Sequence, residues 1–132
     1  MKKVIFLCLI MVLLFSGCSE VSYLSEFPGI PIYPGTEMML GKEFDNKVSV
    51  MYSDMSFKGD VEKVKSFFEK NIDKDIWTVT ESEQPLSDHN VDKIYGYNLK
   101  SKEGNAMLTM AYTNSDKVGK NISITIIGDK IK

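Results

Sequence analysis

The fold is decided by the stretch IYGYNLKSKEGNAMLTMAYT, residues 94–113. It contains two runs of residues with high β-propensity, Ile94–Ser101 and Ala106–Thr113, separated by four residues with turn chemistry. A tight hairpin turn needs a residue that tolerates a positive φ, and Gly104 or Asn105 supplies one. The stretch therefore predicts a β-hairpin.

Strands are expected on both sides of this hairpin. Downstream, a loop over Asn114–Lys120 leads to a final strand over Asn121–Gly128, in which isoleucines alternate with Ser and Thr. Upstream, a strand over Ile76–Glu81 contains the single tryptophan, and the polar stretch Ser82–Asp92 reads as a loop. The second half of the chain is thus an antiparallel β-region.

One amphipathic helix is expected, from Asp60 to Asn71. Asp60 can act as the N-cap, and Glu62 places favourable charge in the first turn. One helix can cover only one face of a sheet. The apolar stripe at helical spacing consists of Val61, Val64, Phe67, Phe68 and Ile72.

Two further strands precede the helix. The first is expected over Thr36–Leu40, ended by Gly41 and Lys42, and the second lies within Phe44–Phe57. The predicted class is α+β: an antiparallel sheet of about five strands with one helix packed on one face, preceded by a signal peptide. This arrangement resembles helix-grip or TATA-box-protein-like folds, a likeness of shape that carries no function.

The chain begins with Lys2 and Lys3, an apolar run over Val4–Phe15, and then Ser16, Gly17 and Cys18. Twelve apolar residues suit a signal segment but are too few to cross a bilayer core of about 30 Å. The pattern resembles the lipobox of bacterial lipoproteins, although Phe15 stands where that family usually has Leu. An uncleaved membrane helix or an ordinary secretory signal are the alternatives.

The resemblance implies cleavage between Gly17 and Cys18 and lipidation of Cys18. The mature protein would then be anchored to a membrane without spanning it. It would lie on the outer membrane facing the periplasm in a cell with two membranes, and otherwise on the outer face of the cytoplasmic membrane. The expected organisation is a signal peptide over 1–17, a lipidated cysteine, tether and Pro-rich arm over 18–35, and a single domain over 36–132.

Three prolines within seven residues exclude a helix over Pro28–Pro34 and predict an extended arm that docks on the domain. The stretch PIYPG, residues 31–35, resembles a group of small bacterial lipoproteins that begin with Pro-x-Tyr-Pro-Gly. That group has no established activity that could be transferred to this chain.

Composition excludes several functions. Without residues 1–17 the chain keeps 14 lysines and no arginine against 18 acidic residues, a net charge of −4. The absence of arginine and the acidic balance argue against a nucleic-acid partner. Cys8 leaves with the signal and Cys18 is lipidated, so the folded domain has no thiol for a disulfide, a metal or catalysis.

No catalytic or cofactor motif is found. His89, the only histidine, lies beside Asp88 but has no recognisable nucleophile or metal partner. The stretch from Asp88 to Asp92 begins like a calcium loop, but Lys93 and Leu99 occupy the places of the required Gly and Glu. The glycosylation triplet that starts at Asn121 is interpreted as a chance match. The sequence therefore predicts a protein that is not an enzyme.

One interaction surface is expected, on the sheet face opposite the helix. Aromatic and methionine side chains on a half-covered face are typical of protein-binding or ligand-binding surfaces. The alternative is that the Pro-rich arm covers this face. We expect an envelope-binding or assembly-accessory domain, or else a small-ligand module that uses the sheet face or the sheet–helix cleft. The candidate residues are Trp77, Tyr95, Tyr97 and Tyr112, with Met107 and Met110.

Overall fold

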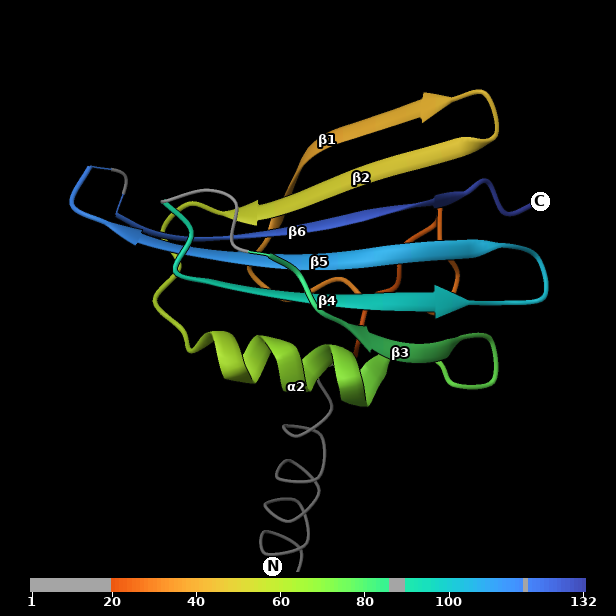
Figure 1. Ribbon diagram of the computed structural model, residues 1–132, viewed down its shortest axis with the longest axis horizontal. Coiled ribbons are helices and arrows are strands. Elements are labelled where there is room, and N and C mark those ends of the chain that lie inside the picture. The colour runs from red at the N-terminus through yellow and green to blue at the C-terminus, as the bar shows by residue number, and fades with distance from the viewer. Residues whose placement is uncertain (1–19, 86–89, 118) are drawn as a thin grey trace, which may run out of the picture.

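The computed structural model describes residues 20–85, 90–117 and 119–132, and shows in this part of the chain one antiparallel sheet and a single helix (Figure 1). The sheet has six strands, so the expectation of about five was wrong by one. Their order is β1-β2-β6-β5-β4-β3. The elements are β1 Glu37–Phe44, β2 Lys47–Asp54, α2 Val61–Asn71, β3 Thr78–Ser82, β4 Lys93–Lys100, β5 Asn105–Ser115 and β6 Gly119–Asp129.

All six stretches with strand patterns join the sheet, and β1 is longer than expected because it does not stop at Gly41. It continues to Phe44 and pairs with β2 through a two-residue turn at Asp45 and Asn46. Asp45 has a φ of 47°, the left-handed conformation that such turns require. A register shift between Met38 and Leu40 marks a β-bulge in β1.

The β5–β6 hairpin is longer than the sequence suggested. A loop over Asn114–Lys120 was expected, but Asn114 pairs with Lys120 and Ser115 with Gly119. That expectation was wrong because polar side chains do not prevent backbone pairing. Gly119, at a φ of 74°, provides the left-handed residue beside the turn.

The β4–β5 hairpin is confirmed, but the role expected of its glycine was wrong. Neither Gly104 nor Asn105, the two residues expected to supply one, has a positive φ. A Cβ at Gly104 would lie 2.7 Å from the Cβ of Asp129 on β6, so the glycine is needed for close approach. The turn itself is held by the Ser101 N–H, which donates to the Gly104 carbonyl oxygen at 2.9 Å.

Helix α2 forms as its sequence predicts. The Asp60 side chain accepts a hydrogen bond from the Glu62 N–H at 2.9 Å, which caps the first turn. Phe67 of the apolar stripe is half-buried, and its ring packs edge-on against Tyr33 at 5.1 Å between centroids. The other stripe residues, Val61, Val64, Phe68 and Ile72, are buried.

The core lies on one face of the sheet. Strand register places Val50, Ile126, Leu108 and Tyr97 in one row across four strands, and all four are buried. This is the face that carries α2, because hydroxyls of β4 bond to helix carboxylates.

The Pro-rich arm docks on the domain, as predicted, and the segment expected to be a tether also joins the core. Leu24, Phe27 and Ile30 are buried. The Leu24 N–H donates to the Ile30 carbonyl at 2.9 Å, and the Ile32 N–H donates to the Ser22 carbonyl at 2.8 Å. Residues 22–32 therefore form a compact hairpin-like segment packed beside α2.

Candidate functional site

The structure places the predicted aromatic surface on the wrong face for an interaction site. Trp77 and Tyr97 are only 1% and 3% exposed, within the core between sheet and helix. Tyr95 and Tyr112 are half-buried on the same side, since Tyr95 is opposite the buried Met110 and Tyr112 opposite the buried Ile122. The alternation of residues between the two faces was predicted correctly. The expectation that the aromatic residues lie on the face opposite the helix was wrong.

Two of these tyrosines connect the sheet to α2. The Tyr97 hydroxyl donates to Glu69 Oε1 at 2.7 Å, and the Tyr95 hydroxyl donates to Glu62 Oε1. Burial raises the pKa of the Tyr97 phenol well above its ordinary value, and the Glu69 hydrogen bond adds to the effect. The Tyr95 hydroxyl in turn lowers the pKa of Glu62. These two hydrogen bonds between tyrosine hydroxyls and helix carboxylates connect α2 to the sheet.

The face opposite the helix carries a different set of exposed apolar side chains. Met107 of β5 lies directly opposite Ile127 of β6, and they are 42% and 50% exposed. Leu40 of β1, 49% exposed, lies opposite Met51 of β2 on the same side. We call this surface the open face. The residues among these apolar groups are small and hydroxylated: Ser49, Thr109 and Thr125.

Sequence reasoning named Met107 but missed Leu40, Met51 and Ile127. The signal was present for Met51 and Ile127, which follow the buried Val50 and Ile126, but not for Leu40, whose neighbours in β1 are all exposed. The mistake was to let aromatic content decide which face is open. Tyrosine packs its ring in a core while its hydroxyl reaches a partner, so its presence does not identify an open face.

The β1 strand is the most exposed part of the sheet. All eight of its residues are exposed, including Met38, Met39 and Phe44 at 49%, 54% and 46%. It forms one edge of the sheet (Figure 1). The Lys42 Nζ lies 4.6 Å from the centroid of the Phe44 ring. The ring at the end of β1 is therefore covered in part by a charged side chain.

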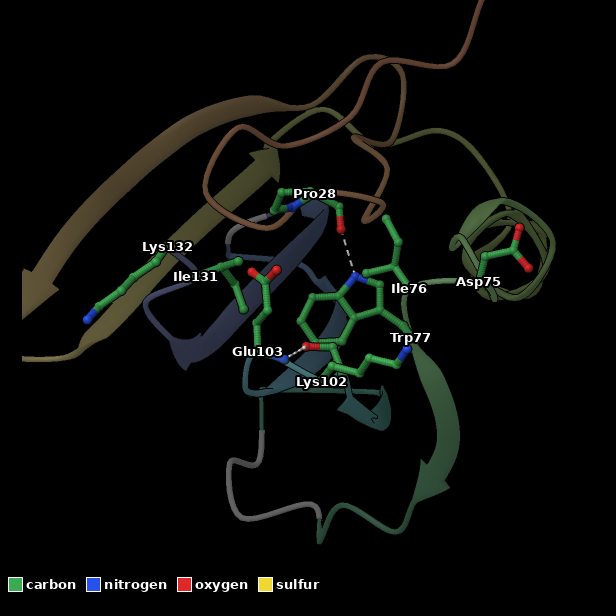
Figure 2. A pocket seen from close by; sticks show the side chains of 9 residues that line it. Pro28, Asp75, Ile76, Trp77, Lys102, Glu103, Ile131 and Lys132 are labelled. Carbon is green, nitrogen blue, oxygen red and sulfur yellow. Dashed lines mark hydrogen bonds between the residues drawn. The ribbon is translucent and has the colours of Figure 1, made fainter.

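A pocket of about 400 Å³ lies at the end of the sheet beside Trp77. Figure 2 shows the edge of the indole turned toward Ile131 and Glu103. The indole N–H is used, since it donates to the Pro28 carbonyl oxygen at 2.7 Å. The pocket combines apolar walls with both signs of charge: Pro28, Ile76, Trp77 and Ile131, with Asp75, Lys102, Glu103 and Lys132.

The metal and catalytic candidates gain no support. Asp88, His89, Gly17 and Cys18 lie outside the described residues. The Asp92 carboxylate accepts a hydrogen bond from the Asn114 N–H, which connects the residue before β4 to β5. Within residues 20–85, 90–117 and 119–132, no three His, Cys, Asp or Glu side chains gather as a metal site would require.

Helix α2, the one helix described, is too short and too polar to cross a membrane. No family model, no curated protein and no solved structure matches this chain. Its function is therefore inferred from its own residues.

Proposed function

We propose that this chain is a lipid-anchored, non-enzymatic protein of the cell envelope that binds another envelope protein through the open face of its sheet. The anchor is the lipidated Cys18, proposed from the signal segment 1–17 and its lipobox-like end. The observation that carries the binding role is the exposed pair Met107 and Ile127, with Leu40 and Met51 on the same face.

The physical argument concerns the exposed apolar area. Single apolar residues on a protein surface are ordinary, but several on one flat face resemble the centre of a protein interface. Ser49, Thr109 and Thr125 add hydroxyls among them, and they can hydrogen-bond a partner without the desolvation cost of charges. Methionine at positions 51 and 107 adapts its shape to a partner surface.

The test is photo-crosslinking in intact cells with the full chain. A photoreactive residue at Ile127 should give one discrete adduct, and the substitution Met107→Lys on the same chain should abolish it. The matched control is Ser66, an exposed residue of α2 on the opposite side of the sheet, where neither the probe nor Ser66→Lys should matter. Equal adducts from both positions would contradict the proposal.

The anchor is tested separately. Metabolic labelling with palmitate should mark the full chain and disappear in Cys18→Ser, while Cys8→Ser should leave the labelled mature protein unchanged. Labelling that persists in Cys18→Ser would overturn the anchor and leave the open-face test unaffected.

A second candidate function is small-ligand binding, favoured by the pocket beside Trp77. This pocket lies at the end of the sheet, whereas the space between sheet and helix is filled by buried side chains. An amphipathic dye, 8-anilinonaphthalene-1-sulfonate, should bind the apolar walls and quench Trp77 by energy transfer. Ile131→Phe, which narrows the pocket without adding a second tryptophan, should weaken this binding, and unchanged binding in that variant would exclude the pocket as the dye site.

A further inference from the structure

The outer edge of β1 is available for a further strand. Among the described strands β1 pairs with β2 alone, so half of its backbone N–H and C=O groups face outward without a strand partner. Its side chains add no cover, since all eight residues are exposed. Such an edge is a template for pairing with another chain unless its sequence opposes it.

The bulge in β1 changes which residues share a face. Glu37 pairs with Ser53 of β2, and Lys42 pairs with Ser49. Ser49 and Ser53 are four residues apart, so they point to the same side of the sheet. Glu37 and Lys42 therefore also share that side, the open face, although they are five residues apart. The additional residue is Met39, which lies within the register shift.

This spacing has a consequence for pairing with a second copy. Two strands related by a two-fold axis run antiparallel, and residues directly opposite each other lie on the same face. With the axis between Met39 and Leu40, Glu37 faces Lys42 of the second copy, and Met38 faces Gly41. In both pairs the two residues lie on the same face. Glu37 and Lys42 are on the open face, and Met38 and Gly41 are on the helix side, because they pair with Tyr52 and Val50 of β2.

Neighbouring registers do not satisfy this rule. With the axis on Leu40, Glu37 would lie opposite Glu43, which is on the other face and has the same charge. With the axis on Met39, Glu37 would lie opposite Gly41, again on the other face. An axis on Lys42 also keeps opposite residues on one face over Leu40–Phe44, but it places the two lysines opposite each other. The register centred between Met39 and Leu40 is therefore the one that satisfies the same-face rule and also has complementary charges.

We propose that β1 pairs antiparallel with β1 of a second copy about a two-fold axis between Met39 and Leu40. Two symmetric Glu37–Lys42 pairs and a central contact of Met39 with Leu40 would define this interface. A lysine in an edge strand usually opposes pairing, but here the opposite carboxylate neutralises it. In the described part of the chain neither Glu37 nor Lys42 forms an ion pair of its own.

Disulfide trapping in membranes tests the register with the full chain. Two variants, Glu37→Cys and Lys42→Cys, are co-expressed in the Cys8→Ser background and oxidised mildly. They should form a covalent dimer, whereas each variant alone should not, because its two cysteines would lie far apart across the axis. The control pair, Glu37→Cys with Glu43→Cys, should also remain monomeric. Absence of the dimer, or an equal dimer in the control, would overturn the proposal.

Charge reversal tests the interface by affinity. Glu37→Lys or Lys42→Glu alone places like charges opposite each other twice and should raise the dimer dissociation constant roughly tenfold, as two cross-strand pairs change sign. The double variant should restore wild-type affinity, measured by sedimentation in detergent. A wild type that stays monomeric, or single variants that dimerise unchanged, would refute the interface. Repeating the measurement in Cys18→Ser separates this result from the question of the anchor.

Discussion

The indole N–H of Trp77 donates a hydrogen bond of 2.7 Å to the carbonyl oxygen of Pro28. This bond joins the residue before β3 to the N-terminal arm, 49 positions earlier in the chain. The Asp73 N–H adds a second connection, to the Gly29 carbonyl at 2.9 Å. The arm is therefore attached to the domain by backbone carbonyls as well as by its buried side chains.

Trp77→Phe should lower the free energy of unfolding by about 1–3 kcal/mol, because it leaves the Pro28 carbonyl without its donor and removes buried volume. Urea unfolding followed by circular dichroism measures this, since the variant has no tryptophan. The matched control is Ile76→Val at an exposed neighbour, which should change stability by less than about 0.5 kcal/mol. Equal effects at both positions would contradict the role of the bond.

Phe27→Ala should be among the most damaging substitutions in the chain. The ring is fully buried, so its loss should cost about 3–5 kcal/mol. Ser25→Ala, two positions away and exposed, is the control and should be nearly neutral. A Phe27→Ala protein as stable as the control would show that the arm is not part of the core.

Alkaline pH should destabilise the protein through Tyr97. Burial raises the pKa of this phenol in the folded state, whereas an unfolded tyrosine ionises near pH 10. The stabilising contribution is therefore complete below about pH 10 and is lost as the pH rises further. Tyr97→Phe should flatten the fall in unfolding free energy between about pH 10 and 12, measured by urea unfolding at each pH. An unchanged slope would contradict this.

Acidic pH should lower the free energy of unfolding through Asp129. The Lys47 ammonium and the Asn105 N–H, the latter at 2.8 Å, hold the pKa of this carboxyl below its usual value. Its contribution is present above about pH 4 and disappears as the pH falls through the folded-state pKa. Asp129→Asn should therefore be less stable than wild type at pH 7, with the difference shrinking at pH 3. A difference that is the same at both pH values would exclude this carboxylate.

The element types were largely predictable from the sequence, because the periods of helix and strand differ. The stripe that includes Val64 and Phe68 identified α2, and the alternation around Ile124 identified β6. Strand ends were harder to predict. Polar residues such as Asn114 and Lys120 pair through their backbones, and side-chain patterns do not report on such pairing.

The candidate site was less predictable. Alternation divides a strand into two faces, but it does not say which face the helix covers. Tyr97 looked like a surface residue and is core, because Glu69 of α2 accepts its hydroxyl. The β1 bulge, which brings Glu37 and Lys42 to one face, depends on pairing with β2 and has no local signature around Met39.

If Cys18 is the proposed anchor, the hydrogen bond between Ile32 and Ser22 also limits how far the domain can lie from the membrane. Only four peptide units separate Ser22 from Cys18, a reach of at most about 14 Å when fully extended. On the proposed anchor, the domain would therefore rest at the bilayer surface with little freedom to turn. A partner would then have to reach the membrane surface to bind it, and two copies would encounter each other by diffusion within that surface rather than in three dimensions.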